Sequence, residues 1–331
     1  IAVLPLIFPH FWEKNYGKIS LMWALAFYIP FLFTGADFAV HELFKVISTE
    51  YIPFIILLFS LYTISGGILV KGSLVGTTKL NIVILIIGTI LASWMGTTGA
   101  AMLLIRPLLK ANKRRKYKVH TIIFFIFLVA NIGGSLTPLG DPPLFIGFLK
   151  GVDFFWTTKH MFFPMLMISF MLLTVYYFID LYYCKKENFT SNQSTENEKI
   201  KLEGSFNFLL IGGVIFAVLL SGMDVFKVPV LEFFHVELFK GNLMRDLILL
   251  GLALLSLIFT RNEFRKINSF TWHPILEVAK LFIGIFITII PAILILNKGS
   301  EGSLSGIVTL VKDVDGQNIN AMYFWLTGIL S

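Results

Sequence analysis

Charged residues and cysteine are scarce in this sequence. Asp, Glu, Lys and Arg together make up 14% of the 331 residues, whereas a soluble globular domain has roughly 25%. So few charges cannot cover the surface of a water-soluble fold of this size, which excludes soluble enzymes and nucleic-acid-binding modules. Cys184 is the only cysteine, so no intrachain disulfide can form and a secreted disulfide scaffold is excluded. The six His residues lack the spacing of a metal site.

Apolar residues are correspondingly abundant. They make up 56% of the chain, Phe alone contributes 34 residues, and the mean hydropathy is +0.81. The excess must face lipid, because a soluble fold cannot bury it. The apolar segments are residues 19–34, 52–70, 80–109, 119–149, 161–183, 206–222, 243–260 and 274–297. Since a membrane-spanning helix needs roughly 20 apolar residues, the sequence predicts an all-α polytopic membrane protein.

Two of these segments, 80–109 and 119–149, are longer than one span and are interrupted by Gly, Thr and Pro. The interruptions read GTILASWMGTTGAA at 88–101 and NIGGSLTPLGDPPLF at 131–145. Irregular backbone at membrane depth persists only inside protein or beside a water-filled cavity, and broken apolar segments mark transporter binding sites. We therefore expect a re-entrant hairpin and an unwound helix at a transport site. The alternative is a pair of kinked spans whose small residues serve helix packing.

Basic residues set the expected orientation. Segment 110–118 carries six of them, and basic loops stay on the cytoplasmic side of a membrane. A re-entrant hairpin at 80–109 returns the chain to the side it came from, which places 71–79 on the cytoplasmic side too. The same topology makes 184–205 and 261–272 cytoplasmic. A simple span at 80–109 would put basic loops on opposite sides, so the charge distribution supports the hairpin.

A short internal repeat fits this topology. Glu50 and Glu277 each stand near the start of an apolar segment, and each is followed nine residues later by a phenylalanine, Phe59 or Phe286. The two segments run in opposite directions, as an inverted repeat requires. Glu277 also stands three residues before Lys280, so it either pairs with that lysine or takes a coupling role in transport.

We accordingly expect two membrane repeats, 1–183 and 206–331, joined by a polar cytoplasmic linker at 184–205. The chain begins inside one apolar run, 1–8, and ends inside another, 321–330. Each run is too short to span and resembles half of a membrane segment. The expected fold is thus an inverted-repeat transporter with a re-entrant hairpin and unwound helices, incomplete at both ends.

Asp141 is the leading candidate for transport chemistry, because an ionisable residue within a membrane segment is costly and marks a function. It lies between Gly140 and Pro142, and the proline pair that begins there prevents regular helix directly after it. Nearby polar side chains belong to Asn131, Ser135 and Thr137. Hard cations prefer oxygen ligands, so this patch suits a proton or a small cation. The alternative is that Asp141 caps a short helix starting at Pro142.

Thr97 and Thr98 stand at the tip of the expected hairpin, between Gly96 and Gly99. Such a tip exposes hydroxyls and backbone dipoles to a central cavity, which makes both residues further candidates. Their alternative role is packing against a neighbouring helix. Asp180 lies near the cytoplasmic end of its segment, where we expect it to act as an interfacial anchor.

The two interrupted segments resemble a known family. Residues 96–109, GTTGAAMLLIRPLL, and residues 131–145 are similar to the NhaD-type sodium:proton antiporters. That family belongs to a superfamily of ion transporters that includes arsenite pumps and dicarboxylate carriers. Further matching stretches are Pro9-His-Phe-Trp12, Tyr16-Gly-Lys18, Tyr51-Ile-Pro-Phe54, Thr63-Ile-Ser-Gly-Gly67 and Glu277-Val-Ala-Lys-Leu-Phe282. The resemblance covers nearly the whole chain.

The resemblance implies exchange of Na⁺ or Li⁺ for protons by alternating access, with no cofactor besides the transported ions. The implied ion-binding residues are Asp141, Asn131, Thr137, Thr97 and Thr98, the first three forming the Na⁺ site. Ser135 and Glu277 are candidates for coupling. The resemblance also implies a multi-pass protein of the bacterial inner membrane, a homodimer whose partners are lipid and small inorganic ions and not nucleic acid. A second hairpin with an Asp-Asn-Ala-Pro-Thr motif is expected just after residue 331.

Three other functions compete with cation exchange. An anion carrier for arsenite or a carboxylate shares the broken-helix plan, although Asp141 favours cations. An intramembrane aspartyl protease needs two facing Asp residues, and the other candidate, Asp180, lies near the interface; the proline pair after Asp141 also breaks the helix that such a residue occupies. The third alternative is a non-functional transporter remnant. We therefore expect a transporter and not an enzyme.

Overall fold

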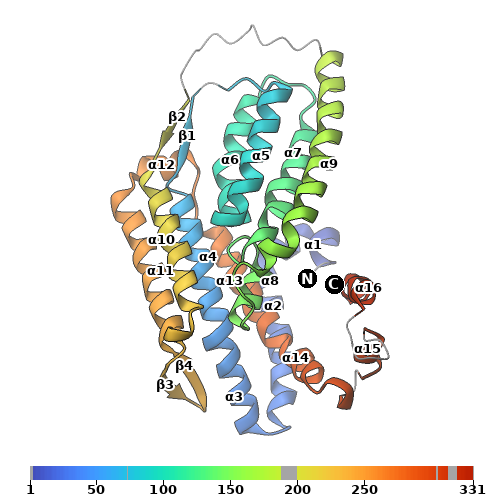
Figure 1. The fold of residues 1–331 in the computed structure, drawn as a ribbon, viewed down its shortest axis with the longest axis vertical. Helices are drawn as coiled ribbons and strands as arrows, with labels where there is room; N and C mark the ends of the chain where they lie inside the picture. The colour runs from blue at the N-terminus through green and yellow to red at the C-terminus, as the bar shows by residue number, and fades with distance from the viewer. Residues whose placement is uncertain (1–2, 73, 188–199, 303–304, 312–318, 331) are drawn as a thin grey trace. The chain divides into compact units, whose positions relative to one another are not determined.

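The computed structural model describes residues 3–72, 74–187, 200–302, 305–311 and 319–330. The chain divides into two compact units. The terminal unit comprises Ile1–Ile47 with Glu277–Ser331, and the central unit comprises Ser48–Leu276. Both interrupted segments of the sequence, with the candidate residues that they carry, lie in the central unit (Figure 1).

Six helical stretches in the described part of the chain are long and apolar enough to cross a membrane. They are Ala36–Ser65, Thr78–Met95, Val119–Leu136, Trp156–Lys186, Lys240–Phe259 and His273–Asn297. The helix α9 (Trp156–Lys186) leaves Phe163, Phe170 and Phe178 between 63% and 77% exposed. Such a surface suits lipid and would be unfavourable in water. The prediction of an all-α polytopic membrane protein is confirmed.

The terminal unit is helical over most of its described residues. Its elements are α1 (Leu4–Ile7), α2 (Pro9–Leu32), α3 (Ala36–Val46), most of α13 (His273–Thr288), α14 (Ile290–Asn297), a 3₁₀ turn (Gly299–Glu301), α15 (Ser305–Leu310) and α16 (Asn320–Leu330). The Ser20 hydroxyl of α2 donates to the Leu281 carbonyl of α13 at 3.2 Å. The Lys280 ammonium lies 5.8 Å from the centre of the Tyr16 ring. These contacts hold α2 against α13.

The central unit contains the remaining elements. They are a π-helical turn (Ile47–Tyr51, whose first residue closes the terminal unit), α4 (Ile52–Ser65), β1 (Leu69–Lys71), α5 (Thr78–Met95), α6 (Thr97–Ala111), α7 (Val119–Phe125), a second π-helical turn (Ile126–Asn131), a 3₁₀ turn (Ile132–Leu136), α8 (Pro142–Leu149), α9, β2 (Lys201–Glu203), α10 (Phe206–Ser221), a 3₁₀ turn (Asp224–Phe226), β3 (Pro229–Phe233), β4 (Val236–Phe239), α11 (Lys240–Phe259) and α12 (Asn262–Ile267). The helix α4 packs against both α10 and α11. Its Phe54, Leu57 and Ile64 side chains are almost fully buried.

The structure corrects the start of the predicted segment that contains α4. The sequence predicts a segment at 52–70, but helical structure runs without interruption from Ala36 to Ser65. Charged residues at 37–50 belong to this helix, so the apolar run marks only its second part. The π-helical turn directly precedes α4, whose second residue is Pro53. Proline cannot donate the backbone hydrogen bond of a regular helix and disturbs the turn before it.

The segment 80–109 forms the expected hairpin. The helices α5 and α6 lie side by side and are separated only by Gly96, whose φ of 79° suits glycine. At the open end, the Gly76 N–H donates to the Ala111 carbonyl at 2.9 Å. Asn81 and Asn112 exchange amide hydrogen bonds of 2.8 and 3.0 Å. The chain therefore leaves the hairpin at the end where it entered.

The segment 119–149 is broken, as predicted. Regular helix ends at Phe125 and resumes only at Pro142, after a π-helical turn, a 3₁₀ turn and five residues without helix. Small residues permit this path: a side chain added to Gly140 would overlap the carbonyl oxygen of Gly134. The two prolines at the start of α8 need no helical N–H partner, which suits the first turn of a helix.

The basic loops of the central unit gather at one end, which we call the basic end. There β1 pairs with β2 in antiparallel register, and Lys71 forms an ion pair of 2.9 Å with Glu203. The Arg115 guanidinium donates to the Gly76 carbonyl at 3.0 Å. The Asn268 amide donates to the Ile68 carbonyl at 2.7 Å. These contacts place the described residues of 71–79, with 110–118 and 261–272, at one end, whereas the β3–β4 hairpin lies at the other (Figure 1).

Candidate functional site

The hairpin tip meets the broken segment at a junction of backbone contacts, which we call the break junction (residues 93–98 and 131–141). The Thr97 N–H, at the start of α6, donates to the Gly140 carbonyl at 3.1 Å. The Ser93 hydroxyl, near the end of α5, donates to the Gly133 carbonyl at 2.5 Å. In return, the Thr137 hydroxyl donates to the Ser93 carbonyl. Two interruptions about 40 residues apart in sequence thus satisfy each other's free backbone groups.

The predicted site residues have different surroundings at this junction. Thr137 is fully buried, and its hydroxyl also accepts the Leu139 N–H at 3.2 Å. Asn131 is exposed, and its amide nitrogen donates to the Ile126 carbonyl at 3.0 Å. The Ser135 hydroxyl donates to the Ile132 carbonyl. Thr137 and Ser135 therefore hold the shape of the break, whereas Asn131 lies on its exposed surface.

Asp141 stands at the start of α8 with an extended backbone, φ −143° and ψ 140°. The helix begins at Pro142, as the capping alternative requires, but the Asp141 side chain forms no capping hydrogen bond with it. The Asp141 side chain is exposed. Its main-chain carbonyl accepts the first amide hydrogen bonds of α8, from Leu144 at 3.1 Å and Phe145 at 3.3 Å. The carboxylate is thus left for solvent or a ligand.

A cavity of about 600 Å³ is lined by the start of α6 together with residues of α4, of the broken segment and of the loop after α12. Its polar lining comes from Tyr62, Thr97, Thr98, Arg106, Asn268, Ser269 and Thr271. The Tyr62 hydroxyl donates to the Thr271 carbonyl at 2.8 Å, and Arg106 donates to the Ile267 carbonyl at 3.3 Å. Asn131, Thr137 and Asp141 do not line this cavity. The predicted site residues therefore fall into two groups, joined through the contact between Thr97 and Gly140.

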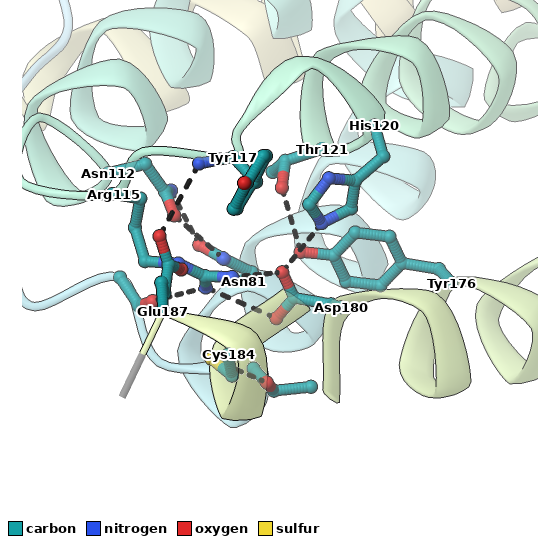
Figure 2. A network of polar contacts seen from close by, with 12 residues as sticks. Asn81, Asn112, Arg115, Tyr117, His120, Thr121, Tyr176, Asp180, Cys184 and Glu187 are labelled. Carbon is teal, nitrogen blue, oxygen red and sulfur yellow. Dashed lines mark hydrogen bonds and ion pairs between the residues drawn. The ribbon is translucent and has the colours of Figure 1, made fainter. Parts of the chain in front are cut away.

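A buried charge network, which we call the α9 network, lies at the basic end (Figure 2). The Asp180 side chain of α9 is fully buried, with its carboxylate 3.0 Å from Arg115 and 2.7 Å from His120 Nε2. Arg115 also forms an ion pair with Glu187. Burial lowers the pKa of Arg115, but its hydrogen bond and charge interaction with Asp180, together with its hydrogen bond to Glu187, outweigh burial and raise the pKa above its ordinary value.

This network corrects the expectation for Asp180. An interfacial anchor would be exposed, whereas Asp180 is the centre of a buried cluster that joins α7, α9 and the loop after α6. Tyr176 contacts Thr121 at 3.2 Å on the same surface of α9. The sequence contained one sign of this network, the basic segment 110–118. Its total charge predicted the membrane orientation of the loop, but not that one of its arginines is buried against Asp180. Nothing local distinguishes Arg115 from the exposed Arg114.

Glu277 belongs to the terminal unit and opens its second chain segment. It lies in α13, near the start of that helix. Its coupling role stays a prediction, as does the division of the chain into repeats 1–183 and 206–331. The expected linker 184–205 falls partly outside the described residues, since 188–199 are not described. Its last described part forms β2.

Gly140→Ala is expected to disrupt the break junction. The new methyl group would overlap the Gly134 carbonyl oxygen, which is backbone and cannot move as a flexible side chain would. We expect a loss of about 1–3 kcal/mol in the free energy of unfolding, measured by unfolding of the purified protein in detergent. Gly147→Ala in α8 is the matched control, because its methyl group would lie 3.8 Å from the nearest side chain, Val152. Equal stability of the two variants would contradict this description.

A family model described as "Putative citrate transport" matches residues 1–331. The match covers the whole chain, including the hairpin, the break and the α9 network. No curated protein and no solved structure matched the chain. The family description indicates membrane transport and is compatible with a cation or a carboxylate as the transported ion.

Proposed function

Because the chain belongs to the CitMHS_2 family of membrane transporters, we propose that it is a secondary transporter that exchanges Na⁺ or Li⁺ for protons by alternating access. The observation that carries the proposal is the exposed Asp141 carboxylate at the break, which forms no capping hydrogen bond with α8. A carboxylate binds either a proton or a hard cation, so the two compete for one site. Because the proton and the cation compete for the same carboxylate, binding of one requires release of the other, which couples their transport.

Oxygen atoms around the break support the cation site. The amide nitrogen of Asn131 is bonded to the Ile126 carbonyl, which leaves the side-chain oxygen of Asn131 as its coordinating atom. Thr137 contributes by fixing the break, since its hydroxyl is bonded to Ser93 and Leu139. Thr97 and Thr98 line the neighbouring cavity, and the hydrogen bond from the Thr97 N–H to the Gly140 carbonyl connects them to the break. The resemblance of residues 96–109 and 131–145 to NhaD-type antiporters favours Na⁺ as the ion.

The proposal includes a membrane orientation. The basic end, with loops 71–79, 110–118 and 261–272, is placed in the cytoplasm because basic loops resist translocation. A bacterial inner membrane and a homodimeric assembly complete the proposal and derive from the same resemblance. Lipid and small inorganic ions are then the partners of the protein.

A second candidate is a carboxylate carrier. The description of the family favours it, and so does the cavity beside the hairpin tip. Arg106 lines that cavity together with the hydroxyl groups of Thr97 and Thr98. Thr97 and Thr98 are the first two residues of the 15-residue helix α6, and Arg106 lies further along it. A guanidinium group and the N-terminal end of a helix both bind carboxylates well. In this alternative, Asp141 binds the coupling cation and the cavity binds the carboxylate.

An exchange assay in everted membrane vesicles separates the candidates. Vesicles containing the full-length protein are given an acid interior, and a fluorescent dye reports the gradient after addition of Na⁺, Li⁺, K⁺, arsenite or citrate. We expect Na⁺ and Li⁺ to collapse the gradient and K⁺ to leave it intact. A response to citrate or arsenite but not to Na⁺ alone would favour the anion carrier. No response to any ion, with insertion confirmed, would contradict both candidates.

A further inference from the structure

The short helix α8 connects the proposed ion site to a second charged contact. It has eight residues, with Asp141 directly before its start and Lys150 directly after its end. The Lys150 ammonium forms an ion pair with the Glu50 carboxylate. The Glu50 side chain is 5% exposed and that of Lys150 is 44% exposed. The largely buried Glu50 carboxylate thus binds the C-terminal end of α8 through Lys150, whereas Asp141 lies at the N-terminal end of the same helix.

Glu50 lies at a special position in the long helix 36–65. It belongs to the π-helical turn Ile47–Tyr51, and the boundary between the terminal and central units falls after Ile47. The chain therefore passes from one unit to the other within this turn. Isolated π-helical turns interrupt the regular hydrogen-bond pattern of an α-helix and are common at functional sites. A change in this turn would move the carboxylate that holds Lys150.

The middle of α8 is held by packing. Phe145 is 1% exposed, and the Arg245 guanidinium lies 5.6 Å from the centre of its ring. The helix also packs directly against α4. An eight-residue helix is too short to bend appreciably and moves as a rigid rod, about 12 Å long. Displacement of the Lys150 end therefore displaces the Asp141 end.

Resting on the proposed function, we propose that the Glu50–Lys150 ion pair positions α8, and through it Asp141, and so couples ion binding at the break to the π-helical turn 47–51. Glu50 touches no transported ion in this proposal. It is a positioning residue that determines where the Asp141 carboxylate lies.

The choice of variants distinguishes a positioning role of the Glu50–Lys150 ion pair from a purely stabilising role. Glu50→Gln keeps the size of the buried side chain and removes its charge, while the released Lys150 ammonium can turn to water. Lys150→Gln instead leaves a buried carboxylate without its cation, which is costly. Lys150→Arg keeps the charge and should retain transport. Glu50→Gln is therefore the informative single change, and the double change tests whether both residues act through one contact.

The experiment measures Na⁺/H⁺ exchange by the full-length protein in proteoliposomes, with half-saturation and maximal rate determined separately. For Glu50→Gln we expect the Na⁺ concentration at half-saturation to rise about tenfold or more. The double variant Glu50→Gln with Lys150→Gln should be no worse than the worse of the two single variants. Loss of folded protein alone would lower the maximal rate and leave half-saturation unchanged, so a raised half-saturation reports on the site. Unfolding of Glu50→Gln in detergent should match that of the wild-type protein.

The matched control is Glu203→Gln, which breaks the partly exposed Lys71–Glu203 pair between β1 and β2. It should leave half-saturation unchanged. A Glu50→Gln variant with wild-type half-saturation, or a double variant with additive effects, overturns the proposal while the proposed function stands. If the wild-type protein carries citrate and not Na⁺, half-saturation of citrate uptake is measured for the same variants, and the same two results overturn the proposal. A wild-type protein that carries neither ion overturns the proposed function itself, and this inference with it.

Discussion

Asp141→Asn is expected to abolish ion exchange while leaving the protein folded and inserted in the membrane. The asparagine keeps the shape of the side chain and its oxygen, but it can neither release a proton nor carry the negative charge that binds a cation. The Asp141 side chain is exposed and forms no capping hydrogen bond with α8, so its replacement removes no capping contact from the fold. We expect gradient collapse by Na⁺ and Li⁺ to fall by about a hundredfold or more, the scale of losing an essential charged group.

Asp224→Asn provides a control with the same chemical change. Asp224 is 92% exposed in its side chain and pairs only with the nearby Lys227 in the described structure. Its replacement should leave exchange at the wild-type level. Expression and insertion of both variants are measured in the same vesicles. If Asp141→Asn retained exchange with a normal dependence on pH, Asp141 would have no part in the mechanism and the cation site would have to be sought elsewhere.

Arg115→Met is expected to cause the largest loss of stability among single changes at the basic end. The Arg115 side chain is 1% exposed and forms ion pairs with Asp180 and Glu187, whose side chains are 0% and 7% exposed. Methionine would leave both carboxylates buried without this cation. Breaking a buried ion pair by removing one partner costs about 3–5 kcal/mol. That is a large part of the total stability of a typical domain, about 5–15 kcal/mol.

The neighbouring Arg114→Met is the matched control for this variant. It removes the same charge from the same loop, but Arg114 is exposed, and exposed substitutions usually change stability by less than about 0.5 kcal/mol. Unfolding of both variants in detergent provides the comparison. Equal loss from the two variants would show that the loop acts through its total positive charge and would contradict the α9 network as a stabilising element.

The sequence predicted the two interrupted segments from their residue types. Gly96, Gly140 and Pro142 interrupt helices for local reasons, because glycine permits unusual backbone angles and proline lacks an N–H. The structure accordingly separates α5 from α6 at Gly96 and begins α8 at Pro142. The start of the long helix at Ala36 was missed, because charged residues inside a helix interrupt an apolar run without interrupting the helix.

The sequence could not predict which polar residues meet. Asp180 and Arg115 are 65 residues apart, and Glu50 and Lys150 are 100 apart. Neither pair follows a helical spacing, so no periodic pattern connects its members. The same limit separated the candidate residues of the break. Thr137 has the residue type of an ion ligand, yet its hydroxyl is bonded to Ser93 and Leu139, which only the packing of the hairpin against the break decides.

The sequence by itself determined that this protein is a helical membrane protein, where its helices break, and that Asp141 lies in a break. These properties depend on hydropathy and on the local chemistry of glycine and proline, which act within a few residues. Only the tertiary structure decided that the hairpin tip and the break satisfy each other's backbone groups, that Asp180 is buried with Arg115, and that Glu50 holds α8 through Lys150. These contacts join distant segments, and a buried charge reveals its partner only when the chain has folded around both.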